Sequence, residues 1–509
     1  MQTPYTQVAE THSAVVFFVG DRAFKLKKPV HLGFLDFRTP QDRAVACARE
    51  VELNRRYAPD VYLGVAEVRD PDGSICDHLI VMRRMPAARR LSALVQARAP
   101  VRRAVRQVAR ILAAQHASAP RGPQIDEQGG RDALRHRWAD NFDQAGRAAG
   151  GLLDPVAVTE MQHLVSQFLA GREPLFEQRI GGGHIVDGHG DLLAGDIFCL
   201  DDGPRILDCL DFDDRLRWLD GLDDAACLAM DLEHFGDRRL GEQFIGWYAE
   251  YSGDPAPVSL CHHYIAYRAF MRAKVACLRC GQGAPAAAVE ARQLADLTLN
   301  HLREGAVALV LIGGLPGTGK SALADAVASR LGATVLSSDR IRKELAGLPP
   351  GKLPAVPYGS GIYAPAATEA TYAELLRRAA SLLARGELVI ADASWASAEH
   401  RAAAAAAAHS TDARLVQLRC AAPADLAAQR LTSRIPGASD ADRDIAQQMA
   451  ADMVPWPEAV TIDTRPGSND NGTGQTSVTG DLIDRAVAAI RPRGPEPAWH
   501  PVRPYMSPG

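Results

Sequence analysis

Short runs of alternating apolar and polar side chains dominate the first 88 residues, a pattern typical of strands with one buried face. The runs Ala14–Val19 and Ala23–Lys27 lie on either side of a Gly-Asp pair, so they predict a β-hairpin. Helical spacing over Arg43–Tyr57 predicts a helix, and strand patterns return over Val61–Val68 and His78–Met85. The sequence therefore predicts a small β-rich lobe with one helix.

Helical periodicity takes over from Leu91 and continues to about residue 304, with a Gly/Pro break near residues 119–130. One β-rich segment, Ile185–Leu210, interrupts it. A small β-rich lobe followed by a large helical lobe is the outline of a bilobal kinase. We therefore predict an α+β bilobal protein-kinase-like domain over residues 1–304, with the small lobe at about 1–88 and the large lobe at about 89–304.

Strands and helices alternate from residue 306 onward, which indicates a parallel sheet wrapped by helices. The expected fold of residues 305–491 is an α/β P-loop NTPase domain with a parallel sheet. Residues 492–509 form a Pro-rich tail. The predicted strands are Val307–Ile312, Thr334–Ser337, Leu388–Ala391, Leu415–Arg419 and Ala459–Ile462.

A complete phosphate-binding motif, G-x-x-x-x-G-K-[ST], follows the first strand of this second domain and precedes a predicted helix. Backbone N–H groups of such a loop surround a di- or triphosphate, and the helix directs its positive end at the same anion. Lys320 is expected to contact the β/γ-phosphates of ATP, and the Ser321 hydroxyl to ligate Mg²⁺. The motif consists of Gly314, Leu315, Pro316, Gly317, Thr318, Gly319, Lys320 and Ser321.

The amino-acid composition favours a folded soluble protein over a membrane protein or a nucleic-acid-binding protein. Apolar residues make up 47% and charged residues 23% of the 509, values that are ordinary for a folded soluble protein. A net charge of −4 gives no global field for nucleic acid or an anionic membrane, so a nucleic-acid partner is not expected. Nine scattered cysteines indicate reduced thiols and a cytoplasmic location. The N-terminus has no signal-peptide pattern, and no apolar run reaches membrane-spanning length.

The segment HGDLLAGDIF, beginning at His189, and the later Leu-Asp-Cys around Asp208 resemble motifs of the aminoglycoside phosphotransferase and choline kinase group. That resemblance implies a catalytic base at Asp191 and a metal ligand at Asp208. The group places an Asn five residues after the catalytic Asp, but this chain has Asp196 there. A carboxylate can also ligate Mg²⁺, although it adds negative charge near ATP. Asp196 is therefore a second candidate metal ligand.

The remaining residues of the first site follow from the expected kinase-like arrangement. Lys25 and Lys27 share one face of the second hairpin strand, and either could contact the α/β-phosphates. Glu50, on the predicted helix, is the expected ion-pair partner; a solvated surface charge is the alternative for each of the three. Arg268 and Arg272 lie four residues apart, so they share a helical face that either lines the acceptor side or faces solvent.

The second domain resembles the small-molecule and nucleic-acid kinase branch of P-loop proteins: gluconate kinases, polynucleotide 5′-kinases and zeta-toxin-like sugar kinases. The residues that carry the likeness follow strand ends. Asp339 is the implied catalytic base, or else a helix N-cap, and Arg342 lies near the acceptor. Asp392 occupies the position of a carboxylate that holds Mg²⁺. Arg401 is a further candidate on the acceptor side.

Two arginines, Arg430 and Arg434, lie one helical turn apart after Pro423. In the P-loop branch they correspond to a lid that clamps the phosphate during transfer.

Taken together, the two resemblances cover nearly the whole chain and match bacterial two-domain proteins with an aminoglycoside-phosphotransferase-like half and an AAA-family ATPase/kinase half. The leading hypothesis is a cytoplasmic kinase that uses ATP and Mg²⁺ at two sites to phosphorylate hydroxyls of small molecules. One alternative is an ATP-binding regulatory or interaction protein with a degraded first site. Another is a polynucleotide kinase. The motifs identify neither acceptor, and they leave the oligomeric state open.

Overall fold

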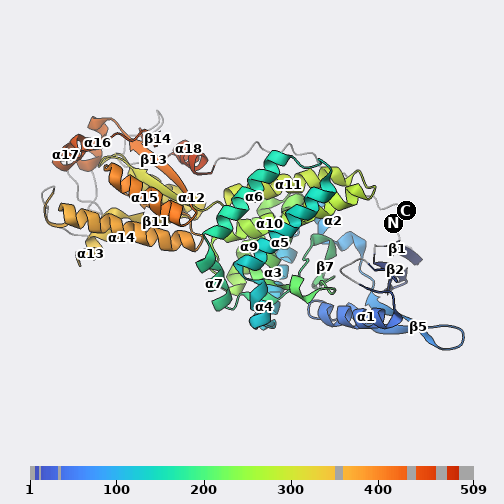
Figure 1. The fold of residues 1–509 in the computed structure, drawn as a ribbon. Helices are drawn as coiled ribbons and strands as arrows, with labels where there is room; N and C mark the ends of the chain where they lie inside the picture. The colour runs from blue at the N-terminus through green and yellow to red at the C-terminus, as the bar shows by residue number, and fades with distance from the viewer. Residues whose placement is uncertain are drawn as a thin grey trace.

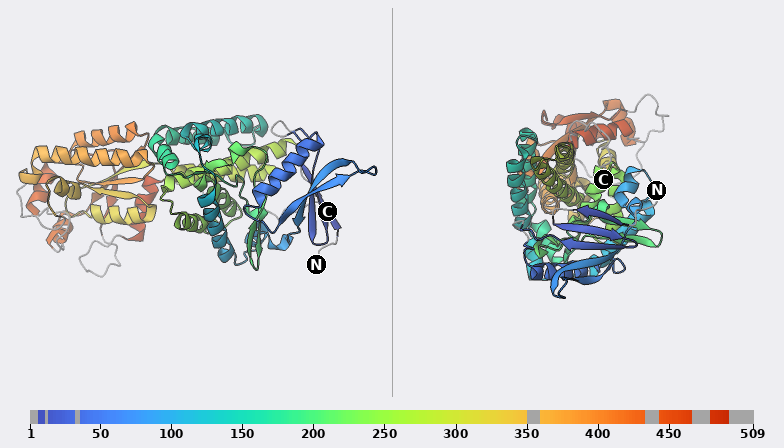
Figure 2. Two further views of the ribbon diagram at one scale, coloured as in Figure 1. Left: turned by 90° about the horizontal axis from the view of Figure 1, so that it is seen from below. Right: turned by 90° about the vertical axis from the view of Figure 1, so that its right-hand side faces the viewer.

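A computed structural model describes residues 6–10, 13–31, 36–349, 359–432, 443–465 and 479–491. Its parts follow one another along a single long axis, with the β-rich lobe at one end, the helical lobe in the middle and the P-loop domain at the other end (Figures 1 and 2). No helix within these ranges has both the length and the apolar character needed to cross a membrane.

The small lobe is a five-stranded antiparallel sheet in the order β1-β2-β3-β5-β4, with helix α1 (Pro40–Asn54) packed on one face. The Thr39 side chain caps the helix by accepting a hydrogen bond from the Asp42 N–H. Apolar residues of the sheet and of α1, among them Ile80 and Val51, form a small separate core. The strands are β1 (Thr6–Glu10), β2 (Ala14–Val19), β3 (Arg22–Lys27), β4 (Tyr62–Arg69) and β5 (Ile75–Arg83).

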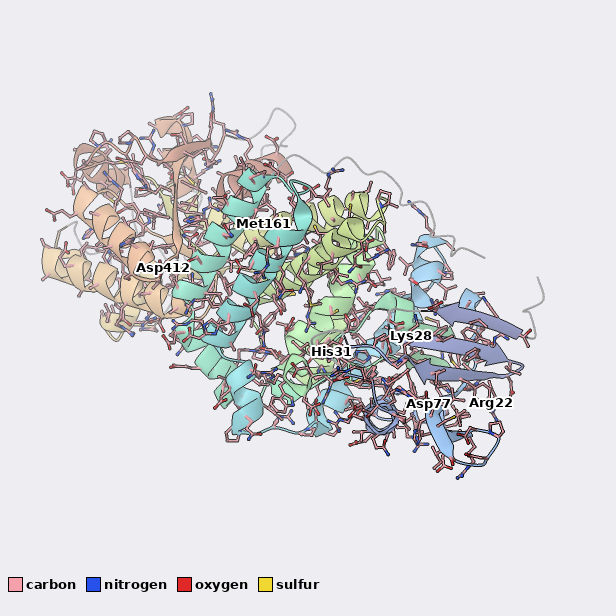
Figure 3. The ribbon with its side chains drawn as sticks, turned by 45° about the vertical axis from the view of Figure 1, so that its right-hand side comes forward. Arg22, Lys28, His31, Asp77, Met161 and Asp412 are labelled. Carbon is pink, nitrogen blue, oxygen red and sulfur yellow. The ribbon has the colours of Figure 1, made fainter. Side chains whose placement is uncertain are left out.

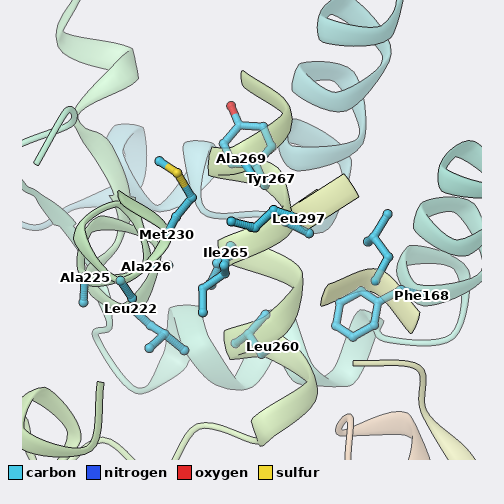
Figure 4. Packing of buried hydrophobic residues seen from close by; sticks show 14 of the residues in the cluster. Phe168, Leu222, Ala225, Ala226, Met230, Leu260, Ile265, Tyr267, Ala269 and Leu297 are labelled. Carbon is cyan, nitrogen blue, oxygen red and sulfur yellow. The ribbon is translucent and has the colours of Figure 1, made fainter. Parts of the chain in front are cut away.

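The large lobe is mainly helical, and its core lies where α8, α10 and α11 cross (Figure 4). Leu222 from α8 and Ile265 and Leu260 from α10 meet there, and all three are buried. The helices are α2 (Leu91–Gln96), α3 (Arg102–Ser118), α4 (Pro123–Gln128), α5 (Arg131–Ala149), α6 (Pro155–Ala170), α7 (Glu173–Gly181), α8 (Gly221–His234), α9 (Arg238–Ser252), α10 (Val258–Gly281) and α11 (Ala287–Glu304).

Two short antiparallel pairs separate α7 from α8. Strand β6 (Ile185–Asp187) pairs with β9 (Trp218–Asp220), and β7 (Ile197–Leu200) pairs with β8 (Gly203–Ile206). The loop between β6 and β7 carries the His-Gly-Asp motif and ends in a 3₁₀ turn over Ala194–Asp196. Because the two pairs fix both ends of the loop, they hold the predicted catalytic segment in place within the large lobe.

The P-loop domain is built on a five-stranded parallel sheet in the order β11-β12-β10-β13-β14. Its first strand, β10, is central and buried throughout, which explains the unbroken apolar run of the sequence. The strands are β10 (Ala308–Gly313), β11 (Thr334–Ser337), β12 (Val389–Asp392), β13 (Arg414–Ala421) and β14 (Val460–Asp463). The helices are α12 (Lys320–Leu331), α13 (Ser338–Leu345), α14 (Pro365–Ala384), α15 (Ala398–Ser410), α16 (Ala424–Thr432), α17 (Arg443–Ala451) and α18 (Gly480–Ile490).

A single apolar core runs from the large lobe into the P-loop domain. Polar contacts cross the same junction: an Arg172 N–H donates to the Thr411 carbonyl at 2.7 Å, and the Ser259 hydroxyl donates to the Gly386 carbonyl at 2.6 Å. Figure 3 marks the neighbouring Asp412 at the border of the P-loop domain, whereas Arg22, Lys28 and Asp77 mark the small lobe. The P-loop domain is therefore packed onto the large lobe rather than tethered to it.

The predicted fold class is confirmed for both parts, and every predicted strand is present with shifts of up to three residues at its ends. The predicted break near residues 119–130 is partly wrong, because it contains the short helix α4, which starts with Pro123. Helix α11 ends at Glu304 and β10 begins at Ala308. The domain limits stay a prediction, since one core spans this junction. The Pro-rich tail, 492–509, lies outside the described residues.

Candidate functional sites

The first site centres on an ion-pair network between the small lobe and the large lobe. Lys25, on β3, places its Nζ 2.7 Å from Glu50 Oε1 and 3.3 Å from Asp208 Oδ1. Glu50 lies on α1, and Asp208 follows β8 in the large lobe. The structure thus brings together three residues that the sequence places 25 and 183 positions apart.

Lys27, two residues along the same strand, faces the same carboxylate but points deeper. Its Nζ lies 2.8 Å from Glu50 Oε2 and 2.7 Å from Asp211 Oδ2, and the side chain is only 5% exposed. Burial alone would raise the pKa of Glu50, but the two lysines lower it to about 2. Glu50 is therefore a carboxylate at neutral pH. Lys25 is the more open of the two lysines and the one that contacts Asp208.

The loop between β6 and β7, which is the predicted catalytic loop, is anchored by Asp224 on α8. This buried carboxylate accepts the backbone N–H groups of His189 at 2.6 Å and Gly190 at 3.0 Å. It also lies 3.1 Å from Nε2 of His116. Burial would raise the pKa of Asp224, yet the hydrogen bond and charge of His116 keep it well below its usual range. The loop is thus fixed by a charged acceptor rather than by packing alone.

The predicted base and metal ligands of the first site lie close enough to influence one another's charge. Burial, followed by the charges of Asp208 and Asp191, raises the pKa of Asp196 to about 8. Asp191 Oδ1 is buried, and no described residue donates a hydrogen bond to it. Asp208 has a φ of 65°, an uncommon backbone conformation for a residue other than Gly. Backbone strain at Asp208 and the unpaired Asp191 oxygen fit a site that binds a cation-bearing ligand.

Arg268 and Arg272 have different surroundings despite their helical spacing. Arg268 is buried, with Nε 2.7 Å from Asp223 Oδ1 and another N–H donating to the Gly190 carbonyl at 2.7 Å. Its predicted place on the acceptor side is wrong, because it supports the catalytic loop from inside. Arg272 is half-buried; burial would lower its pKa, but nearby carboxylates, Asp191 first among them, raise it. Contact of Arg272 with an acceptor stays a prediction.

The second site lies at the carboxyl edge of the parallel sheet. The strand register aligns Ile312 of β10 with Asp392 of β12, and Asp392 with Ser337 of β11. The loops that leave these strands therefore converge. Ser321, at the start of α12, donates its hydroxyl to Asp392 Oδ2 at 2.7 Å. Burial raises the pKa of Asp392, whereas Lys320 and Ser321 oppose that shift.

Close backbone approach explains two glycines of the phosphate-binding loop. A Cβ at Gly314 would lie 2.5 Å from the Cys420 carbonyl oxygen, and one at Gly317 would lie 2.5 Å from that of Ala427. Both residues also have positive φ, at 134° and 79°. The Lys320 Nζ lies 3.3 Å from the Leu315 carbonyl, so the lysine folds back over the loop. The loop is therefore built to surround an anion with backbone N–H groups.

A pocket of about 740 Å³ joins the phosphate-binding loop to the predicted acceptor residues. Lys320, Ser321 and Asp392 line one part, and Asp339 and Arg342 line another. Asp339 is not the N-cap of α13, which begins one residue earlier and has Ser337 at that position. An Arg342 N–H lies 3.1 Å from Asp339 Oδ1. The carboxylate of Asp339 is thus available in the pocket that also contains the loop.

The remaining arginines of the second site divide into three cases. Arg430 lines the pocket, and one of its N–H groups donates to the Thr464 carbonyl at 2.7 Å. Arg434 lies outside the described residues. Arg401 is buried and donates to the carbonyls of Trp395 and Pro455 at 2.8 and 2.9 Å. Its prediction as an acceptor residue is wrong, because those bonds join the start of α15 to the segment before β14.

Several pocket residues had no signal in the sequence. Tyr372 stacks on His400 with ring centroids 3.8 Å apart, and its hydroxyl lies 3.1 Å from Ser394 Oγ. Glu369 Oε1 lies 2.8 Å from Nε2 of His400. These four residues line the acceptor part of the pocket. They belong to no short motif, and only the fold brings α14, α15 and the end of β12 together.

The carboxylate and hydroxyl oxygens in both candidate sites are of the kind that ligate Mg²⁺. Within the described ranges, no group of three or more His, Cys, Asp or Glu side chains is arranged to hold a metal ion. Mg²⁺ takes one or two protein oxygens and completes its shell with water and substrate phosphates. Asp208 and Asp196 are the donors available in the first site, and Ser321 and Asp392 those in the second.

Comparison with known proteins gives a family. The AAA domain model matches residues 309–455, which includes the phosphate-binding loop. The chain is 45% identical to "Uncharacterized protein Rv2004c" of Mycobacterium tuberculosis over 474 aligned residues. The alignment covers 93% of this chain and 95% of the relative. "Uncharacterized protein Mb2027c" of Mycobacterium bovis gives the same values.

The chain belongs to the family of these mycobacterial proteins. The predicted AAA P-loop domain is thereby confirmed. Among solved structures, a choline/ethanolamine kinase family protein from Mesorhizobium loti is 16% identical, with a TM-score of 0.38, over 59% of this chain and 92% of its own. A gluconokinase from Sinorhizobium meliloti 1021 is 18% identical, with a TM-score of 0.25, over 36% of this chain and 91% of its own.

Proposed function

We propose that the protein is an ATP-dependent phosphotransferase with two nucleotide sites, each of which transfers the γ-phosphate of ATP to a hydroxyl of a small molecule. One observation carries the proposal: a single pocket contains the phosphate-binding loop, the Ser321–Asp392 pair and the carboxylate of Asp339. Phosphoryl transfer requires these groups together, because catalysis consists mainly of positioning and charge stabilisation.

In the second site, each residue has a distinct task. The loop N–H groups and Lys320 hold the β/γ-phosphates, and Ser321 with Asp392 would hold Mg²⁺, which neutralises charge that builds up on the transferred group. Asp339 orients the acceptor hydroxyl and takes its proton as the new O–P bond forms and ADP leaves. Arg342 keeps the Asp339 carboxylate in place through its 3.1 Å contact. Arg430, beside Thr464, lies where it can clamp the phosphoryl group during transfer.

The first site assigns the same tasks to residues from different elements. Lys25, fixed by Glu50, is the proposed phosphate contact, because it is more open than Lys27 and lies beside Asp208. Asp208 and Asp196 would hold Mg²⁺, and Asp191 is the proposed base. The buried, unpaired Asp191 oxygen supports this assignment.

The test uses the full chain, because the two parts share a core. Purified protein is incubated with Mg-ATP and a panel of hydroxyl-bearing metabolites, and phosphorylated products are read by mass. Asp339→Asn should keep nucleotide binding and slow transfer to the second acceptor by about 10²–10⁴-fold, the range for loss of a general base. Asp484→Asn, an exposed change on α18, serves as the matched control. Undiminished turnover in Asp339→Asn would exclude the proposed mechanism.

A regulatory role for the first site is the second candidate, and one observation favours it. Position 196 is a carboxylate with a pKa raised to about 8 by burial and by its acidic neighbours. Without a bound cation such a group is mostly protonated at pH 7, so it must lose that proton before it can ligate Mg²⁺, and this weakens the site for Mg-ATP. If Asp191→Asn leaves all product formation unchanged while the first site still binds Mg-ATP, the regulatory role is correct for that site.

A further inference from the structure

A second large pocket, of about 490 Å³, lies at the junction of the large lobe and the P-loop domain. It contains no residue of either proposed nucleotide site. Helices α8, α9, α10 and α11 line it from the large lobe, and the end of α12 together with Arg491, just after α18, lines it from the P-loop domain. Its volume is within the range of pockets that take small organic ligands.

Much of the pocket wall is apolar. Leu222, Ile245 and Ile265 come from the large lobe, and Leu331 comes from α12. Figure 4 shows Leu222 and Ile265 on the neighbouring helices α8 and α10. A wall of this kind accepts the hydrocarbon part of a ligand, because burying apolar surface is favourable on both sides.

The carboxylates of the pocket already have partners, and Asp254 accepts hydrogen bonds from Arg179 through both of its oxygens. Glu304 binds Arg238 through two hydrogen bonds, at 3.0 and 2.6 Å. Glu242 Oε1 lies 3.0 Å from the same arginine. Glu233 Oε2 lies 2.9 Å from Nε2 of His301. These groups are therefore satisfied without a ligand.

The two arginines contributed by the P-loop domain differ from these carboxylates. Neither Arg330, exposed in the last turn of α12, nor the Arg491 side chain has a hydrogen-bond acceptor among the described residues. The Nε of Arg491 is buried without a partner. Two guanidinium groups that line the pocket without a hydrogen-bonded acceptor favour an anionic group, because charge-assisted hydrogen bonds to such a group are strong. The charge of Glu304 reaches Arg491 and opposes the lowering of its pKa by burial, but it makes no hydrogen bond to that side chain.

We propose that this junction pocket binds a small organic anion whose apolar body packs against the large lobe and whose negative group is held by Arg330 and Arg491. A medium-chain carboxylate is the chemical class that fits. The ligand would contact both domains at once. It would also contact α8, which carries Asp224 of the first site, and α12, which begins with Lys320 of the second.

The test is calorimetric titration of the full-length protein with octanoate as the probe, at pH 7.5. Octane-1-sulfonate, 1-octanol and octylammonium are titrated in parallel. The two anions should bind at least tenfold more tightly than the neutral alcohol or the cation. Binding that is equal for all four would show hydrophobic adsorption alone, and preference for octylammonium would show that the carboxylates select the ligand; either outcome overturns the proposal.

Substitutions locate the binding. The double variant Arg330→Gln/Arg491→Gln should weaken octanoate at least tenfold, whereas Arg485→Gln, an exposed change on α18, should leave it unchanged. Gly246 lines the pocket on α9, and a Cβ added there would meet no atom within 4 Å. Gly246→Leu should therefore fill space without displacing packed atoms and should abolish binding. Octanoate affinity that survives in both the double variant and Gly246→Leu overturns the proposal.

Thermal melting of each variant serves as the control for correct folding. A variant that loses octanoate binding but melts within about 3 °C of the parent has lost the site and not the fold. If the arginine pair proves destabilising, Gly246→Leu, which changes neither charge nor a packed side chain, gives an independent result.

Discussion

The two proposed nucleotide sites differ in how the chain assembles them. In the second, a continuous stretch from Gly314 to Ser321 supplies every proposed phosphate contact apart from Arg430. In the first, the contacts come from β3, α1, the catalytic loop and the segment after β8, and they meet only when two lobes pack together. A continuous motif forms locally, whereas the dispersed site depends on tertiary structure. Damage to packing should therefore affect the first site more than the second.

Charge balance separates the sites as well. Lys25 is shared between Glu50 and Asp208 before any ligand binds, and Asp196, Asp191 and Asp208 oppose one another. Lys320, in contrast, contacts a backbone carbonyl, and no ion pair involving it occurs among the described residues. The second site is thus prepared for an anion, whereas the first needs a cation to relieve repulsion.

The largest expected effect breaks the second site alone. Lys320→Ala should weaken ATP at that site by more than about 100-fold, because charge-assisted contacts to phosphate are lost in a loop with no second lysine. Calorimetric titration of the full chain should then show one remaining class of nucleotide site. Lys343→Ala would not serve as a control, because Lys343 is buried and its loss could destabilise the fold. Arg485→Ala is the matched control, and two binding classes persisting in Lys320→Ala would contradict the assignment.

The free energy of unfolding should depend on pH through Asp231, which lies under the first site. Asp231 is buried beneath the catalytic segment and accepts the Ala194 N–H at 2.8 Å, and burial raises its pKa to about 6. The folded state then binds more protons than the unfolded state between pH ~4 and ~6, so the contribution of Asp231 falls as pH rises through that window, by about 2–3 kcal/mol. Denaturant unfolding of the wild type and Asp231→Asn at pH 4.5 and 7 measures it.

Asn keeps an acceptor for the Ala194 N–H but does not ionise. Asp231→Asn should therefore gain stability relative to the wild type as pH rises from 4.5 to 7. An equal pH dependence in the two proteins would show that Asp231 does not titrate in this range.

Substitutions of Lys25 and Lys27 should have smaller effects, and they should differ in kind. Lys25→Met should weaken Mg-ATP at the first site by about tenfold, the effect of roughly one lost charge-assisted contact. Lys27→Met should mainly destabilise the fold, because it leaves the half-buried Asp211 and the buried Glu50 with one cation fewer. Nucleotide titration paired with thermal melting separates the two outcomes; the reverse pattern would make Lys27 the phosphate contact.

The smallest expected effect concerns position 196. Asp196→Asn should keep or improve Mg-ATP affinity at the first site, by less than about tenfold, because Asn retains an oxygen ligand and needs no deprotonation before it binds Mg²⁺. Nucleotide titration at low and high Mg²⁺ measures it. Loss of binding in Asp196→Asn would mean that the site requires all three carboxylates.

Prediction from sequence succeeded where information was local. The phosphate-binding loop, the strands that flank it and the kinase-like hairpin all follow from patterns within about ten residues. It failed for Arg268 and Arg401, since helical spacing shows that residues share a face but not which face is buried. It also had no means to find Asp224, whose hydrogen bonds to the His189 and Gly190 N–H groups join segments about 35 residues apart.

The Lys25/Lys27 question shows the same limit at finer scale. Alternation places both lysines on one face of β3, and the sequence does not rank them. The structure separates them through depth, because Lys27 is covered by Phe37 and Asp211 while Lys25 faces Asp208. How deeply each residue on one strand face is buried depends on the tertiary structure packed over it, and the alternation of residues along the strand does not reveal it.

The core shared by the large lobe and the P-loop domain has a consequence for synthesis of the chain. At ~5–20 residues per second, the roughly 200 residues after Glu304 take about 10–40 s to emerge from a ribosome. During that time the surface around Leu175, Ser259 and Gly171 has no partner, and Gly171 in particular waits for the Thr411 carbonyl, which would lie 2.1 Å from any Cβ placed there. The nascent N-terminal part therefore exposes this surface until the second domain is complete.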